Sequence, residues 1–165
     1  MLRFTICTLS FSLYCFCSYS QSKFDTIFQQ PVLIKEYVSA LAHDSMQGRA
    51  TGTEGMMKAA YFIAEQMKSI GLQPVKNNDG YFMNYGKLSP WDTYEAINVI
   101  GYIPGSSKPD ELVIFSAHYD HLGKIKSKKD SVYNGANDNA SGTALLLQLA
   151  SYFTQTKPER TILFI

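Results

Sequence analysis

The sequence predicts an α/β fold, and three segments near its C-terminal end carry that prediction. Residues 111–117 and 161–165 are short, continuous apolar runs, which are typical of strands covered on both faces of a sheet. Between them, residues 142–153 have the apolar spacing of a helix. The residues expected on its buried face are Leu145, Leu146, Leu149 and Phe153. Two strands joined by a helix of this length form a right-handed βαβ unit.

Two further amphipathic helices are expected earlier in the chain. The first spans Pro31–Ala42, and its apolar residues recur at every fourth position: Leu33, Tyr37 and Leu41. A polar, glycine-rich loop follows over residues 43–53. Thr51 and Glu54 have the spacing of a capping box, which would start the second helix. Gly71 is the expected stop signal of that helix.

The middle of the chain predicts strands. Tyr81–Leu88 is a weak candidate, whereas Ala96–Ile103 alternates apolar and polar residues as one strand before a Pro-Gly break. The chain then ends inside the apolar run that closes at Ile165. A domain rarely ends on such a strand, so we expect this domain to continue beyond Ile165; the alternative is a C-terminal edge strand.

Length and charge limit the function classes. The 165 residues are enough for one domain with a core, and the formal net charge of +1 gives no global field for nucleic acid. Aromatic residues make up 13% of the chain, which favours a packed domain over a disordered segment.

Residues 1–20 have the pattern of a signal peptide, and residues 21–165 form the expected domain. One charge, Arg3, precedes an apolar run that reaches Cys17, and the small residues Ser18 and Ser20 follow at alternate positions. A membrane anchor is the alternative, but the run is shorter than the roughly 20 apolar residues that span a bilayer. We therefore expect export, to the periplasm or the medium, and no stable membrane insertion after cleavage. All three cysteines lie in this leader, so a metal site in the mature chain must use His, Asp and Glu.

The residues suited to chemistry lie in two short segments, 116–123 and 134–142, at ends of the predicted elements where an open α/β sheet binds ligands. His118 and Asp120 point the same way along an extended chain, and a metal-bound imidazole usually donates its other N–H to a carboxylate. Asp138 lies among small residues and could bridge two metal ions. Taken singly, His118 and Asp120 could be a solvated turn, and Asp138 could be a helix cap.

Taken together, the stretches His-Tyr-Asp-His-Leu-Gly, from His118, and Asn-Gly-Ala-Asn-Asp-Asn-Ala-Ser-Gly, from Asn134, resemble the co-catalytic zinc aminopeptidases of metallopeptidase family twenty-eight. The resemblance extends to the Gly-Arg-Ala-Thr-Gly-Thr loop that begins at Gly48. It implies a zinc exopeptidase-like, three-layer αβα fold with a mixed, largely parallel central sheet, of which this chain would be the N-terminal portion.

The resemblance also implies roles for individual residues. His118 would bind one zinc ion, Asp138 would bridge two, and Asp120 would orient His118 without touching metal. His121 matches the motif but is not a ligand in the family, and His43 is expected to be an ordinary helix-end histidine. A Glu-Glu pair, an Asp and a His would complete the family's site, and the pair would follow the strand that closes at Ile165.

The function expected from this resemblance is hydrolysis of an N-terminal peptide bond by a water molecule activated by two zinc ions. The substrate would be a peptide with a free N-terminus, and the 165-residue chain alone would be inactive. The alternatives are a carboxypeptidase or glutaminyl cyclase of the same superfamily, a receptor-like binding domain without metal, and a gene-model fragment.

Overall fold

The computed structural model describes residues 31–86, 96–125 and 131–165. The expected signal peptide, residues 1–20, lies outside these ranges. The fold described below lies in the compact unit of residues 32–165. No helix among the described residues has the length and apolar character to cross a membrane.

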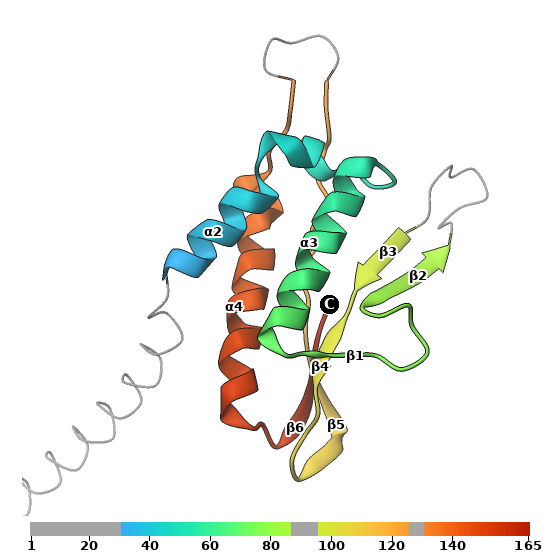
Figure 1. Cartoon of the computed structure of the whole chain (residues 1–165), viewed down its shortest axis with the longest axis vertical. Helices are drawn as coiled ribbons and strands as arrows, with labels where there is room; N and C mark the ends of the chain where they lie inside the picture. Colours follow the sequence, from blue (N-terminus) through green and yellow to red (C-terminus); the bar gives the residue numbers. More distant parts are fainter. Residues whose placement is uncertain (1–30, 87–95, 126–130) are drawn as a thin grey trace, which may run out of the picture. The chain divides into compact units, whose positions relative to one another are not determined.

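The described residues contain two sheets and three α-helices (Figure 1). The helices are α2 (Pro31–Leu41), α3 (Glu54–Ile70) and α4 (Ser141–Thr156). The larger sheet has the strand order β1-β4-β6-β5, and its strands are β1 (Gln73–Pro74), β4 (Gly101–Ile103), β5 (Lys108–Phe115) and β6 (Arg160–Phe164). The smaller sheet pairs β2 (Phe82–Gly86) with β3 (Ala96–Val99).

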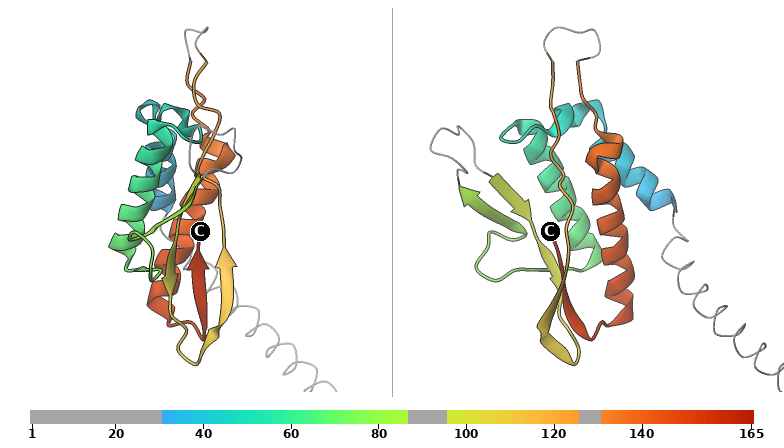
Figure 2. Two further views of the ribbon diagram at one scale, coloured as in Figure 1. Left: turned by 90° about the vertical axis from the view of Figure 1, so that its right-hand side faces the viewer. Right: turned by 180° about the vertical axis from the view of Figure 1, so that it is seen from behind.

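The sheet is mixed, as expected for this α/β fold. β5 and β6 are parallel, and α4 connects them, so the predicted strand–helix–strand unit is confirmed. β4 pairs antiparallel with both β6 and β1. One core cluster joins the three helices to the sheet, and its fully buried members include Leu41, Met67, Leu147 and Phe164. The two views in Figure 2 show the helices packed beside the strands.

The second strand prediction is wrong in one respect, because Ala96–Ile103 is two strands rather than one. β3 ends at Val99 and pairs with β2, whereas β4 starts at Gly101 and pairs with β6 and β1. The interruption falls at Ile100, whose N–H donates to the carbonyl of Tyr81 at 2.7 Å. A regular alternation of side chains cannot reveal a change of partner, because both halves keep the same period.

The expected double burial of residues 111–117 is also wrong. β5 forms an edge of the described sheet, and the side chains of Leu112 and Ile114 are 60% and 55% exposed. Apolar content predicted a strand correctly, but burial depends on what packs against each face. A smaller correction concerns α4, where Leu145 is exposed and its neighbour Leu147 is fully buried.

The start of α3 differs from the expected capping box. Thr53, not Thr51, is the N-cap, and its hydroxyl accepts from the N–H of Met56 at 3.3 Å. The C-terminal prediction is confirmed: Gly71 has φ 91°, a left-handed conformation that favours glycine. The loop before α3 also contains a short 3₁₀ turn, Asp44–Arg49, which His43 caps by accepting from the N–H of Ser45. His43 is therefore a helix-end histidine, as predicted.

Candidate metal centre

The first polar segment leaves the sheet at the carboxyl end of β5. Its backbone continues the pairing with β6, since the N–H of Ala117 donates to the carbonyl of Ile165 at 3.0 Å. The N–H of Ile165 donates in turn to Phe115 at 2.9 Å. His118 therefore follows directly after a hydrogen-bonded strand end.

The second polar segment forms an irregular turn, Ala136–Ala140, that leads into α4. It reaches the first segment through His118, whose carbonyl accepts from the side chains of Asn139 at 3.3 Å and Thr143 at 3.2 Å. The result is a close pair of side chains: Nε2 of His118 lies 3.3 Å from Oδ1 of Asp138. Both are open to solvent, with exposed fractions of 57% and 68%.

Asp138 is not the helix cap that its position suggested as an alternative. The N-cap of α4 is Ala140, and the N–H of Gly142 in the first turn donates to the amide oxygen of Asn139 at 3.1 Å. Among the described residues, the contacts of the Asp138 carboxylate are with histidines: Oδ1 faces His118, and Oδ2 lies 3.6 Å from Nδ1 of His121. The neighbouring asparagine therefore binds a first-turn N–H of the helix, whereas the Asp138 carboxylate lies beside the two histidines.

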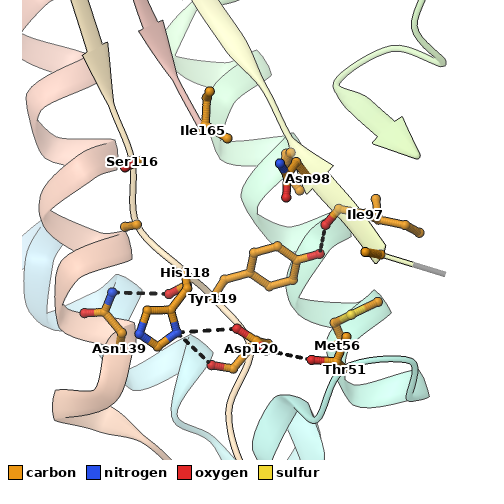
Figure 3. Close-up of a pocket in the computed structure, with 13 residues that line it drawn as sticks. Thr51, Met56, Ile97, Asn98, Ser116, His118, Tyr119, Asp120, Asn139 and Ile165 are labelled. Carbon is orange, nitrogen blue, oxygen red and sulfur yellow. Dashed lines mark hydrogen bonds and ion pairs between the residues drawn. The ribbon is translucent and has the colours of Figure 1, made fainter. Parts of the chain in front are cut away.

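Asp120 lies on the other side of the His118 ring (Figure 3). Its Oδ1 atom is 3.4 Å from Nδ1 of His118, and its backbone carbonyl is 3.3 Å from the same nitrogen. Its second oxygen, Oδ2, accepts a hydrogen bond of 2.6 Å from the hydroxyl of Thr51. The imidazole thus has a carboxylate near each nitrogen, Asp120 at Nδ1 and Asp138 at Nε2.

Arg49 connects the segments that carry these side chains, although its side chain is fully buried. Its guanidinium donates to the carbonyls of Tyr119 at 2.7 Å, Asn134 at 2.7 Å and Gly135 at 2.9 Å, and also to that of Leu41 at the end of α2. Burial lowers the pKa of Arg49, and the nearby carboxylates Asp120 and Asp138 act in the opposite direction.

His121 supports the site from the protein interior. Its side chain is 11% exposed, and its ring meets Tyr133 edge-on at 6.4 Å between centroids. Its backbone N–H donates to the carbonyl of Arg49 at 3.0 Å. Gly135 leaves room for this packing, because a Cβ there would lie 2.6 Å from the His121 ring and 2.5 Å from the Asp138 carbonyl oxygen.

Two of these side chains fit zinc. Zn²⁺ prefers tetrahedral coordination with bond lengths of about 2.0–2.2 Å to nitrogen and oxygen, so neighbouring ligand atoms lie roughly 3.3 Å apart. The 3.3 Å between His118 Nε2 and Asp138 Oδ1 matches one edge of such a tetrahedron. Within residues 31–86, 96–125 and 131–165, no group of three or more His, Cys, Asp or Glu side chains could hold a metal. The described residues thus offer two side-chain atoms at the spacing of zinc ligands, fewer than the roughly four donors that zinc requires.

A cavity of about 580 Å³ adjoins His118 and Asp120, between these residues and β3. Its lining includes Ile97, Asn98, Ser116 and Tyr119 (Figure 3). The hydroxyl of Tyr119 donates to the carbonyl of Ile97 at 2.8 Å, and burial raises the pKa of Tyr119 to about 12. Tyr119 is therefore a neutral hydrogen-bond donor that holds the His118 segment against β3.

The structure brings together all three residues that the sequence assigned to the site, His118, Asp120 and Asp138. Sequence reasoning missed the two residues that hold them in place. The loop containing Arg49 and Thr51 was part of the resemblance, but Thr51 was assigned to a helix cap and Arg49 had no assigned role. Their partners are up to 86 residues away in sequence, so no local pattern could have identified them.

Comparison with known proteins agrees with the resemblance drawn from the motifs. The sequence model of peptidase family M28 matches residues 98–165. A protein of Pyricularia oryzae described as "Probable zinc metalloprotease" is 30% identical over 116 residues. That alignment covers 68% of this chain and 23% of the relative, so the chain spans about a quarter of the relative's length.

Solved structures share the fold. A glutaminyl cyclase from Fimbriiglobus ruber aligns with a TM-score of 0.62 at 22% identity, over 81% of this chain and 43% of that one. A leucine aminopeptidase precursor from Bacteroides thetaiotaomicron aligns with a TM-score of 0.56 at 20% identity, over 80% of this chain and 44% of that one. The resemblance to peptidase family M28, a family of zinc metallopeptidases, is therefore confirmed, and it is a likeness to the N-terminal portion of such proteins.

Proposed function

We propose that the chain contributes the His118 and Asp138 ligands of a two-zinc centre in an exported aminopeptidase. The observation that carries the proposal is the 3.3 Å separation of His118 Nε2 and Asp138 Oδ1, with Asp120 at the opposite nitrogen of the same ring. The match to peptidase family M28 over residues 98–165 supports the metal and the class of reaction.

In this proposal each side chain has a distinct task. Asp120 accepts a hydrogen bond from the Nδ1–H of His118, which leaves the Nε2 lone pair free for metal and makes the imidazole a more basic ligand. Asp138 offers one carboxylate oxygen beside that lone pair, and its second oxygen faces away from it toward His121. Zinc, when bound, supplies Lewis acidity and lowers the pKa of bound water.

The proposed substrate is a peptide with a free N-terminus. The cavity beside His118 combines the apolar side chain of Ile97 with the amide of Asn98, so it offers both apolar and hydrogen-bonding contacts to a terminal residue. A general base is not among the residues assigned here, because the resemblance assigns that role to a Glu-Glu pair beyond Ile165. We therefore expect the 165-residue chain to hold metal weakly and to lack turnover.

The metal assignment is tested by titrating zinc into the ¹⁵N-labelled chain and following the imidazole resonances. The expected result is a zinc-dependent change at His118 that is lost in His118→Ala. His43→Ala is the matched control, because the His43 ring contacts Ser45 at a helix end and neither of the two aspartates beside His118. Zinc binding that persists without His118 would contradict the assignment.

The reaction is tested on a longer polypeptide that contains these residues together with the Glu-Glu pair expected beyond Ile165. Release of the N-terminal residue from an aminoacyl chromogenic substrate is expected. Cyclisation of an N-terminal glutamine without peptide hydrolysis would favour the cyclase instead. Turnover by the 165-residue chain itself would contradict the expected need for a further base.

A further inference from the structure

We propose that Thr51 is a positioning residue for the candidate metal centre, acting through Asp120 on the ring of His118. The Thr51 hydroxyl donates to Asp120 Oδ2 at 2.6 Å, and the other oxygen of that carboxylate lies 3.4 Å from His118 Nδ1 (Figure 3). This inference rests on the proposed role of His118 as a metal ligand and adds a residue that neither the motif nor the comparisons assign.

The hydrogen bond is of the strong kind. A hydroxyl bound to a carboxylate at 2.5–2.7 Å has the length typical of a charge-assisted O–H···O⁻ bond. The Asp120 side chain is 43% exposed, so without a partner its carboxylate could rotate toward solvent. A donor that holds Oδ2 selects the rotamer in which Oδ1 faces the imidazole.

Thr51 is free for this contact because it does not cap α3. The cap is Thr53, whose hydroxyl accepts from Met56 N–H and donates to the carbonyl of Ala50 at 2.6 Å. Two threonines of the same loop thus have separate tasks, one at the helix and one at the site. That separation provides a matched control for an experiment.

The loop holds Thr51 at a fixed distance from Asp120. Two residues before Thr51, the Arg49 guanidinium donates to the carbonyl of Tyr119, and the Arg49 carbonyl accepts from the N–H of His121. The residues on both sides of Asp120 are therefore hydrogen-bonded to Arg49. Because both backbone segments are restrained, removal of the Thr51 hydroxyl should release the Asp120 carboxylate without moving the backbone.

The experiment compares Thr51→Val, Thr51→Ser and Thr53→Val in the ¹⁵N-labelled, metal-free chain. The readout is the ratio of the Nδ1–H to the Nε2–H tautomer in the neutral His118 imidazole, from its two ring-nitrogen shifts. Assignment is direct, because the chain has three histidines. We expect Thr51→Val to lower this ratio several-fold and Thr51→Ser to restore it.

Thr53→Val should lower stability through loss of the helix cap and leave the His118 ratio unchanged. An unchanged ratio in Thr51→Val, or an equal change in Thr53→Val, would overturn the inference. A general loss of packing would also change the Tyr133 ring contact of His121, so the His121 resonances report separately on that outcome.

Zinc affinity gives a second readout. Residues that hydrogen-bond a metal ligand typically contribute about 10–100-fold to metal affinity. Thr51 bonds Asp120 rather than the ligand His118 itself, so we expect Thr51→Val to weaken zinc binding by about tenfold at most. In a longer polypeptide that carries the Glu-Glu pair, failure to bind zinc through His118 would contradict the proposed function, and the tautomer ratio of the 165-residue chain would still decide the role of Thr51. Zinc binding through His118 with an unaltered ratio in Thr51→Val would leave the proposed function standing and reject the inference.

Discussion

His118 and Asp138 place a ring nitrogen and a carboxylate oxygen 3.3 Å apart, although the residues belong to different segments of the fold. His118 follows the end of β5, and Asp138 precedes α4. Because β5, α4 and β6 form one parallel crossover, the end of the first strand and the start of the helix meet at the same edge of the sheet. The crossover therefore brings the two proposed ligands together.

Asp138→Asn should separate the metal role of this position from a structural one. The side chain is 68% exposed, and the first-turn N–H of Gly142 donates to Asn139 rather than to Asp138, so we expect a change in unfolding free energy of no more than about 0.5 kcal/mol. Zinc-induced shifts at His118 should nevertheless disappear, because an amide is a far weaker zinc donor than a carboxylate. Urea unfolding and a zinc titration measure the two effects.

Asn139→Ala is the counterpart of that variant. It removes the acceptor for the Gly142 N–H and the donor to the His118 carbonyl, and should lower the unfolding free energy by about 1 kcal/mol. Its zinc response should be closer to that of the wild type than the response of Asp138→Asn. The reverse pattern, a large stability loss in Asp138→Asn with zinc binding retained, would mean that Asp138 is a helix-terminus residue.

The sequence predicted the residues of the candidate site but not the residues that hold them in place, and the reason is physical. A histidine and an aspartate spaced by two, at the end of an apolar strand, are recognisable because their chemistry and local geometry lie within a few residues. Thr51 and Arg49 act through partners that only the folded chain brings near, so their sequence context shows no more than a polar loop. Local rules even favoured the wrong threonine as the cap of α3.

The fold likewise has features that sequence patterns predicted and features that they could not predict. Short continuous apolar runs indicated the parallel pair β5 and β6, and periodicity identified α2, α3 and α4. It could not distinguish one long strand from the successive strands β3 and β4, which share a period but pair with different partners. It also could not predict the exposure of β5, because exposure is a property of neighbours in space.

Arg49→Met should destabilise the domain strongly. The substitution leaves four backbone carbonyls without their donor in a fully buried position, and we expect the unfolding free energy to fall by at least about 3 kcal/mol. Arg160→Met is the matched control, because Arg160 makes a half-exposed ion pair with Glu111 and should cost about 1 kcal/mol or less. Urea unfolding measures both; equal losses would show that the buried network contributes nothing beyond a surface ion pair.

Gly135→Ala should lower the unfolding free energy by more than the conformational penalty of placing alanine at a positive φ. Gly135 has φ 60°, and a Cβ there would lie 2.5 Å from the Asp138 carbonyl oxygen. Gly80 has the same φ with nothing within 4 Å, so Gly80→Ala measures the conformational penalty by itself, about 1 kcal/mol. We expect Gly135→Ala to lose about 1–3 kcal/mol more than Gly80→Ala, with altered His121 resonances. Equal losses would show that the turn has room to relax.

Tyr119 makes stability depend on alkaline pH. Burial raises its pKa to about 12, whereas an unfolded tyrosine titrates near pH 10, so the folded state favours the neutral phenol. The resulting stabilisation is complete below about pH 10 and is lost as the pH rises toward 12.

Tyr119→Phe cannot ionise, so its stability should fall less steeply across that window than that of the wild type. At neutral pH it should be about 1 kcal/mol less stable, because the bond to the Ile97 carbonyl is gone. Urea unfolding at a series of pH values measures both effects, and Tyr61→Phe, at a 57% exposed position, is the control. A wild-type slope in Tyr119→Phe would mean that another group is responsible for the alkaline loss.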